Sequence, residues 1–234
     1  LTTLAWLAGR TDRIRLQTGI LLAALRRPVV LAKSAATLDV LSGGRLDLGV
    51  GVGWQEAEYT AAGLDFGDRG RLLDHALEVC EALWEGGRVS YESPELGFEG
   101  VYSMPGPVEA SGIPIWVSGT ANRRTARRLA RFGTGWIPWG DDRADPVAGM
   151  ARMCALFDEL GLGEVPAEVQ GPVATVREPD GAVDLSATMA GVPNLVAAGV
   201  TDCRLTLRLP DGLEEATDLL GRAVSAFRSA VGRP

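Results

Sequence analysis

Short apolar runs alternate with longer amphipathic stretches along the chain, and this alternation constrains the fold more than any other feature. The apolar runs occupy residues 14–22, 45–51, 114–118, 136–138, 169–177 and 203–209. The amphipathic stretches, which have helical periodicity, occupy residues 28–41, 69–84, 122–132, 146–160, 185–198 and 213–231. Residues 1–9 have the pattern of the end of a helix that stops at Gly9. Six strand–helix units in strict order predict parallel strands with helical crossovers, and therefore an α/β fold.

Two architectures are compatible with six such units. A doubly wound open sheet uses six strands, whereas an eight-stranded α/β barrel needs two more. The given sequence starts with a predicted helix that has no strand before it, and this favours the barrel. Residues 88–112 interrupt the alternation and predict an irregular excursion with a short hairpin around residues 89–91 and 101–103. Since no linker is visible, we expect one domain over residues 1–234.

Composition and charge exclude several classes of protein. The 234 residues are 46% hydrophobic and carry a net charge of −7, which argues against a nucleic-acid partner. The sequence contains no run of eighteen apolar residues, so it predicts no membrane span. Three widely spaced cysteines form no disulfide framework and favour a reducing, cytoplasmic location. With a single histidine, His75, which we expect at or near the surface, the chain offers no His-based metal site and no Ser/His/Asp triad.

Glycines at two predicted strand ends indicate a site or close packing. Gly49, Gly51 and Gly53 occupy every second position through the end of one predicted strand. Because glycine weakens a strand, its repeated use here indicates another role. One reason is the close approach of a flat ligand to the backbone, and the other is tight packing of the protein itself. Gly19, at the end of the strand before it, predicts a bulge or an unusual peptide, with a packing role as the alternative.

A third segment combines a strand end with a helix start. Ser118, Gly119 and Thr120 come directly before the predicted helix at 122–132, whose free N–H groups and positive dipole end favour an anion. The alternative is an ordinary helix cap made by Thr120 or Asn122. The five arginines of that helix are best interpreted as a solvated face. Three tryptophans near strand ends, Trp54, Trp136 and Trp139, are candidates for the wall of a ligand pocket, with core filling as the alternative for Trp136.

Several of these segments together resemble the luciferase-like monooxygenase superfamily, especially its branch that uses the deazaflavin coenzyme F420. The resemblance rests on Leu31-Ala-Lys33, Leu38-Asp-Val-Leu-Ser-Gly-Gly-Arg45 and Leu48-Gly-Val-Gly-Val-Gly-Trp54. Phe66-Gly-Asp-Arg69, Pro114-Ile-Trp-Val-Ser-Gly119 and Phe132-Gly-Thr-Gly-Trp136 follow in the family's order. The resemblance implies a TIM-type (β/α)8 barrel in which the run at 14–22 is the third strand. We therefore expect a barrel that lacks its first two strands in this chain.

The resemblance also implies a set of coenzyme-binding residues. Gly19 and Ile20 match the bulge behind the coenzyme ring, where relatives have a cis, non-prolyl peptide. Gly51, Val52, Gly53 and Trp54 match a strand end beside the coenzyme. Ser118, Gly119 and Thr120 match the loop that holds its phosphate. No catalytic acid or base is identified.

The implied function is a coenzyme F420-dependent oxidoreductase that transfers a hydride between the deazaflavin and an organic substrate. Because reduced deazaflavin reacts poorly with oxygen, reduction or dehydrogenation fits it better than monooxygenation. The alternatives are a monooxygenase that uses flavin mononucleotide (FMN), and a truncated, non-catalytic barrel fragment that only binds a ligand or a partner. A small-molecule substrate and a homo-oligomer are the partners we expect.

Overall fold

The computed structural model describes residues 1–232, which form two compact units. Unit 1 consists of residues 1–119 and 127–135, and unit 2 consists of residues 120–126 and those from Trp136 on. Helix α5 (Arg123–Phe132) gives its first residues to unit 2 and the rest to unit 1. The expectation of a single domain stays a prediction.

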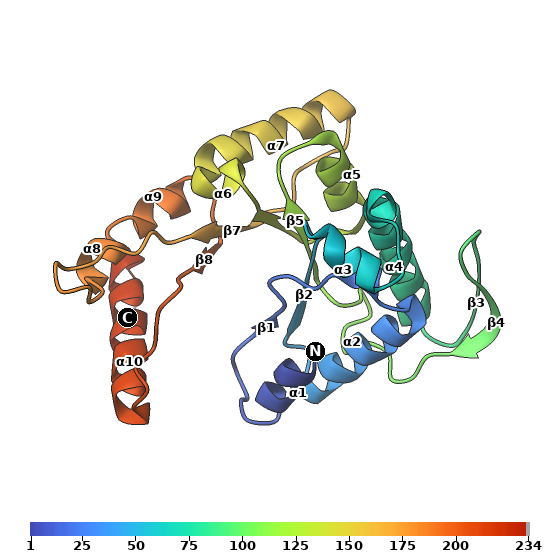
Figure 1. The fold of residues 1–234 in the computed structure, drawn as a ribbon, viewed down its shortest axis with the longest axis horizontal. Helices are drawn as coiled ribbons and strands as arrows, with labels where there is room; N and C mark the ends of the chain where they lie inside the picture. The colour runs from blue at the N-terminus through green and yellow to red at the C-terminus, as the bar shows by residue number, and fades with distance from the viewer. Residues whose placement is uncertain (233–234) are drawn as a thin grey trace. The chain divides into compact units, whose positions relative to one another are not determined.

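Unit 1 is built on parallel strands, as the alternation predicts. Strand β2 (Leu46–Val50) lies between β1 (Leu16–Gln17) and β5 (Ile115–Gly119), and all three run parallel (Figure 1). Every residue of β2 is buried, as expected for a strand covered on both faces. Strand β1 is much shorter than the predicted run at 14–22, because the regular ladder ends after Gln17 and the next residue paired with β2 is Leu21, which forms an isolated bridge with Val50.

The helices of unit 1 begin and end where proline and glycine predict. Helix α2 (Pro28–Ser42) has Pro28 in its first turn and ends at Gly43, whose φ of 67° is the left-handed conformation that favours glycine. It packs against α4 (Arg69–Trp84), where the Trp84 indole donates to the Ala32 carbonyl at 3.1 Å. Helix α1 (Thr2–Ala8) precedes them. The short elements η1 (Ala23–Leu25), α3 (Glu56–Ala61) and η2 (Phe66–Asp68) are absent from the sequence prediction.

An arginine fixes the irregular segment between α1 and β1. The Arg45 guanidinium donates to the carbonyls of Ala8 at 3.1 Å, Thr11 at 2.6 Å and Ile14 at 2.8 Å. It also donates to the Thr11 hydroxyl at 2.9 Å and to the Ser42 carbonyl at 2.6 Å. One side chain thus supplies the hydrogen bonds that secondary structure would otherwise give to this segment.

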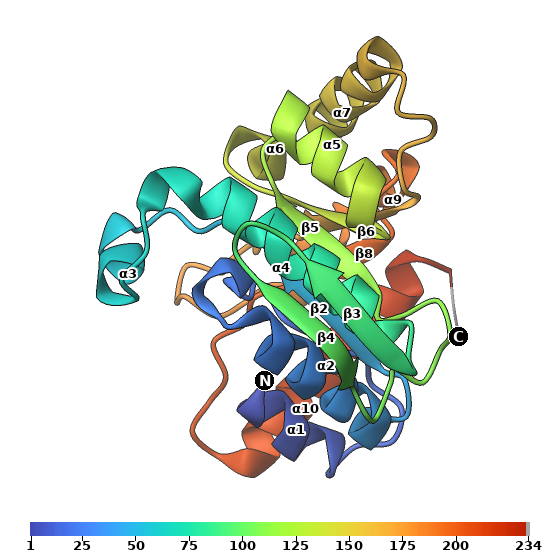
Figure 2. The ribbon, with the colours of Figure 1, turned by 90° about the vertical axis from the view of Figure 1, so that its right-hand side faces the viewer.

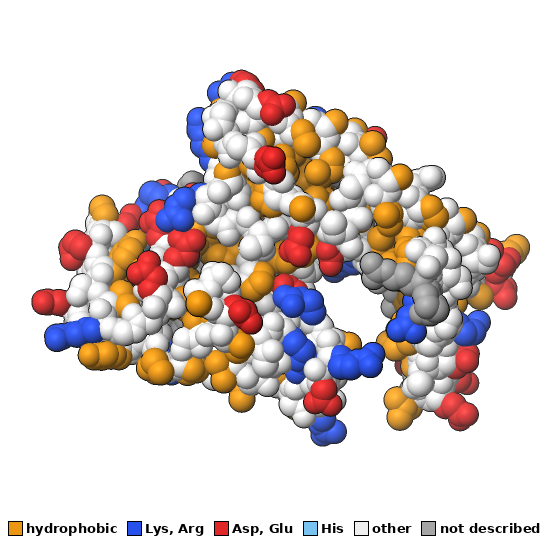
Figure 3. Space-filling model, turned by 180° about the vertical axis from the view of Figure 1, so that it is seen from behind, with side chains coloured by type: hydrophobic (Ala, Val, Ile, Leu, Met, Phe, Trp, Pro, Cys, Tyr) orange, Lys and Arg blue, Asp and Glu red, His pale blue; other side chains and the backbone are white. Residues whose placement is uncertain are grey.

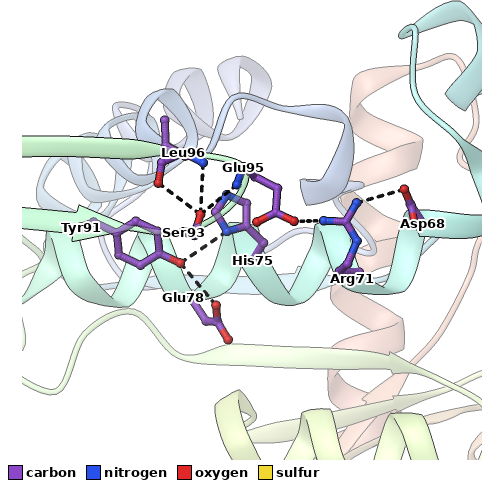
Figure 4. A network of polar contacts seen from close by, with 8 residues as sticks. All are labelled: Asp68, Arg71, His75, Glu78, Tyr91, Ser93, Glu95 and Leu96. Carbon is purple, nitrogen blue, oxygen red and sulfur yellow. Dashed lines mark hydrogen bonds and ion pairs between the residues drawn. The ribbon is translucent and has the colours of Figure 1, made fainter.

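The excursion at 88–112 contains an antiparallel hairpin, which is longer than predicted. Its strands are β3 (Arg88–Glu92) and β4 (Gly97–Tyr102), and Figure 2 shows them in front of α4. Tyr91 of β3 lies over α4, with its hydroxyl 3.4 Å from Nδ1 of His75 and 3.3 Å from a Glu78 carboxylate oxygen (Figure 4). His75 is therefore buried, with 8% exposed, because the hairpin covers it; of the two expected positions, at the surface or near it, the one at the surface is wrong.

A second group of contacts in Figure 4 holds the hairpin's turn. Arg71 of α4 pairs with Glu95 and with Asp68, the latter at 2.9 Å. The Ser93 hydroxyl accepts from the backbone N–H of Leu96 at 3.1 Å and donates to its carbonyl at 3.1 Å. The hairpin and α4 are thus joined by polar side chains as well as by packing.

Unit 2 alternates helices and short strands. It contains most of β6 (Gly135–Pro138), then α6 (Asp141–Ala144), α7 (Pro146–Leu160), β7 (Glu168–Pro172), α8 (Leu185–Met189), α9 (Val192–Ala197), β8 (Asp202–Arg204) and α10 (Leu213–Ala230). Strands β7 and β8 pair in parallel, with Gln170 opposite Asp202. The single helix predicted at 185–198 is wrong. It is two helices, because Pro193 lacks the N–H that would continue α8 and instead sits in the first turn of α9.

The surface carries both signs of charge. On the face in Figure 3, basic and acidic side chains are interspersed, with hydrophobic side chains between them. Among residues 1–232 no helix combines the length and apolar character needed to cross a membrane. Over the same residues, no three His, Cys, Asp or Glu side chains come together in a way that would hold a metal ion.

Candidate functional site

The predicted bulge after β1 is present, and two hydrogen bonds define it. The Gly49 carbonyl of β2 accepts from the Thr18 hydroxyl at 2.7 Å and from the Leu21 N–H at 2.8 Å. Gly19 and Ile20 lie between these two anchors and bulge out of the ladder. Their peptide bond is cis and non-prolyl, as the resemblance implies.

Three of the predicted segments meet at Gly51 in unit 1. A Cβ atom placed on Gly51 would collide with Cδ1 of Ile20 and would lie 3.4 Å from Cβ of Ser118. The bulge, the end of β2 and the end of β5 therefore converge at one point. Glycine at position 51 leaves room for the Ile20 side chain at the strand end, which agrees with the alternative of close protein packing.

The residues after Gly51 turn sharply out of the strand. Gly53 has φ of 72°, and a Cβ there would lie 2.9 Å from Cδ2 of Leu22. The Val52 carbonyl between the two glycines accepts a hydrogen bond from the Tyr59 hydroxyl at 2.7 Å. Trp54 follows with 70% of its surface exposed, so it is available to border a ligand. Trp136, in contrast, is fully buried and fills the core, so it is not available to border a ligand.

The loop at 118–120 leads into a helix that has its own cap. The Asn122 carboxamide oxygen accepts from the N–H groups of Arg124 at 2.9 Å and Thr125 at 3.1 Å. Its nitrogen donates to the carbonyl and hydroxyl of Thr120, both at 3.0 Å. Asn122 is therefore the N-cap of α5, as the alternative interpretation has it. The phosphate role of Ser118, Gly119 and Thr120 stays a prediction.

A buried carboxylate lies beside the same helix start in unit 2. Asp142 accepts from the Ala121 N–H at 2.7 Å and from the Arg152 guanidinium at 2.6 and 2.9 Å. Its side chain is 6% exposed, and the ion pair with Arg152 balances its charge. Of the N–H groups at this end, those of residues 121, 124 and 125 are thus already used by the protein.

Ion pairs occupy several of the α5 arginines. Arg128 is 8% exposed and pairs with Asp74 through two bonds of 2.5 and 3.0 Å. Arg131 pairs with Glu81 at 2.9 Å, and Arg123 pairs with Glu159. The interpretation of this helix as a solvated face is therefore wrong for Arg128, because α4 covers it.

Two features were missed by sequence reasoning. Tyr59 is fully buried and reaches the strand end, but its identity alone gives no sign of a contact seven residues away. In unit 2 a cavity of about 610 Å³ has mostly apolar walls, with Arg143, Val173 and Leu195 among its lining residues. That volume suits a small molecule. None of the nine residues predicted to bind coenzyme lines it.

Comparison with known proteins decides the family. Residues 1–216 match the sequence pattern described as luciferase-like monooxygenase. The chain belongs to the luciferase-like monooxygenase family. An uncharacterised protein of Mycobacterium tuberculosis is 35% identical over 165 residues, which cover 70% of this chain and 58% of that protein. The chain thus spans little more than half the length of this relative.

Two relatives with named activities differ in their coenzymes. The F420-dependent glucose-6-phosphate dehydrogenase of Nocardia farcinica is 34% identical over 145 residues, or 58% of this chain and 42% of that one. The oxygenase component of a flavin-dependent trigonelline monooxygenase from Acinetobacter baylyi is 33% identical over 117 residues, or 49% of this chain and 32% of that one.

A solved structure extends the similarity to the fold. An F420-dependent secondary alcohol dehydrogenase, in complex with an F420–acetone adduct, superposes with a TM-score of 0.74 and 17% identity. The superposition covers 96% of this chain and 84% of that one. The α/β fold of this luciferase-like chain is therefore consistent with the family's TIM-type barrel. The expectation that the chain lacks two strands of such a barrel stays a prediction.

Proposed function

We propose that this chain supplies the coenzyme-binding face of an oxidoreductase that transfers a hydride between F420 and an organic substrate. One observation carries the proposal: Ile20, Gly51 and Ser118, which the resemblance assigns to the coenzyme from three separate strand ends, meet at one point. Similarity to an F420-dependent dehydrogenase supports the choice of deazaflavin.

The residues present suit a flat ring. Ile20 offers an apolar side chain that packs over the end of β2, and Trp54 offers an exposed aromatic surface. Trp116 lies two residues before Ser118, and so on the same face of β5. Its Nε1–H is buried and has no acceptor among the described residues.

Each segment has a separate task in this proposal. Ile20 backs the ring, and residues 51–54 border it, so that one ring face stays accessible to the substrate. The backbone of Ser118, Gly119 and Thr120 binds the phosphate. The coenzyme, when bound, accepts or donates the hydride, which is a proton with two electrons. The protein contributes position and shielding from water.

Fluorescence titration of the chain with F420 and with FMN tests this function. We expect micromolar or tighter binding of F420 and weaker binding of FMN. A preference for FMN would instead favour a flavin-dependent monooxygenase, the second candidate, which the similarity to the trigonelline enzyme supports. Binding of neither coenzyme would overturn both.

A substitution pair tests the phosphate loop separately. Gly119→Asp places a carboxylate where the phosphate binds, so we expect at least a tenfold loss of affinity, about 1.4 kcal/mol, with little change in Tm. Asn122→Ala removes the observed cap and should lower the stability by about 1 kcal/mol while F420 still binds. Unchanged affinity in Gly119→Asp would leave the loop with a capping role alone.

A further inference from the structure

Tyr59 is held rigidly beneath the end of β2. Its side chain has no exposed surface, and its ring meets Phe66 edge-to-face with centroids 5.5 Å apart. Phe66 is covered in turn by the Arg69 guanidinium, 3.9 Å from its ring centroid. Burial raises the pKa of Tyr59, and Glu58 adds to this, although Arg69 opposes it. The phenol therefore stays protonated at neutral pH and acts as a donor.

The hydroxyl of Tyr59 orients a single peptide unit in the predicted coenzyme segment. It donates to the Val52 carbonyl at 2.7 Å, which draws that oxygen toward the protein interior. In a planar trans peptide the following N–H points in the opposite direction. The Gly53 N–H is thus directed away from Tyr59, and it has no acceptor among the described residues. Gly53 is partly exposed, so a ligand can reach it.

We propose that Tyr59 is a positioning residue, which fixes the Val52–Gly53 peptide so that the Gly53 N–H can donate to a bound coenzyme. The acceptor would be one of the pyrimidinedione carbonyls that deazaflavin and flavin rings share. The inference rests on the proposed function, because it assumes that residues 51–54 border the ring. It assigns a role to a residue outside the nine predicted from sequence.

The test compares two tyrosine substitutions in unit 1. Tyr59→Phe removes the hydroxyl and keeps the ring on Phe66. Tyr91→Phe is the matched control, because it removes a hydroxyl that bonds to His75 and Glu78. Loss of one hydrogen bond predicts a decrease in F420 affinity of about fivefold for Tyr59→Phe and none for Tyr91→Phe. A common decrease in both variants would show a general loss of stability and overturn the proposal.

Nuclear magnetic resonance of the ¹⁵N-labelled chain separates this inference from the proposed function. In the free protein, the Gly53 amide signal should move in Tyr59→Phe and stay in place in Tyr91→Phe. On addition of F420 to the wild type, that amide proton should shift downfield, and by less in Tyr59→Phe. If the Gly53 signal does not move in Tyr59→Phe, or does not move in the wild type although F420 binds, the role of Tyr59 is refuted. The proposed function is not affected by that result. Failure of the wild type to bind either F420 or FMN would refute the proposed function and this inference together.

Discussion

Replacement of Gly51 by alanine should weaken coenzyme binding more than it weakens the fold. The added Cβ would collide with Cδ1 of Ile20, the end of a half-buried and flexible side chain, whereas Ser118 at 3.4 Å needs no movement. The backbone of Gly51 is not in the left-handed region, so alanine adds no strain there. Ile20 must therefore rotate away from the end of β2.

The two effects have different sizes. Forcing Ile20 from its preferred rotamer costs about 0.5–1.5 kcal/mol. The Gly→Ala change also restricts the unfolded chain, which stabilises the folded state by about 0.4–1 kcal/mol. The net change in stability is within about 1 kcal/mol, which corresponds to at most about 4 °C in Tm for a chain of this size. Displacing two carbon atoms of Ile20 from beneath the ring removes about 1.6 kcal/mol of apolar contact, which is roughly a tenfold loss of affinity.

F420 fluorescence titration and thermal unfolding, measured on the same preparations, decide the matter. Gly70→Ala is the control, because a Cβ at this position in α4 meets only Arg128, at an ordinary 3.5 Å. It should keep full affinity. If Gly51→Ala binds F420 like the wild type, Ile20 does not back the ring. If instead its Tm falls by more than about 10 °C, Ile20 is not free to move.

Gly53→Ala and Gly63→Ala share the same backbone penalty, about 1–2 kcal/mol, because their φ angles are 72° and 71°. Only Gly53→Ala also crowds Leu22, so urea unfolding should show the larger loss for it, and equal losses would contradict this packing. Burial raises the pKa of Cys80 to about 12, whereas Cys154 is exposed. At pH 8 a disulfide reagent such as Ellman's should modify Cys154 in the folded chain and Cys80 only after unfolding, and equally fast reaction of both would be inconsistent with this structure.

The longer elements could be predicted because sequence signals agree with one another there. Helices α2 and α4 combine apolar periodicity with Pro28 at one start and Gly43 after one end. The errors lie where a local pattern competes with backbone chemistry. Residues 185–198 have helical spacing, but Pro193 divides them. The run at 14–22 is apolar, yet its bonds to Gly49 lift Gly19 and Ile20 out of the ladder.

The site was only partly predictable for a related reason. Family resemblance placed Ile20, Gly51 and Ser118 in one site, and the structure brings them together. The reason for glycine at position 51 is its contact with Ile20, which is 31 residues away and invisible in local sequence. The bond from Tyr59 to Val52 is likewise set by the packing of α3 and η2, elements too short to show a periodic pattern.

The hydrogen bonds of Arg45 have a consequence for digestion by proteases. Residues 9–15 have no regular secondary structure and contain Arg10, Arg13 and Arg15, so their sequence presents three bonds that trypsin recognises. A protease must draw several consecutive residues into an extended strand before it can cut. Because Arg45 holds the carbonyls of Ala8, Thr11 and Ile14 in place, that extension requires breaking its bonds first. The hydrogen bonds of the Arg45 guanidinium can therefore protect residues 9–15 from trypsin, although this segment has no regular secondary structure.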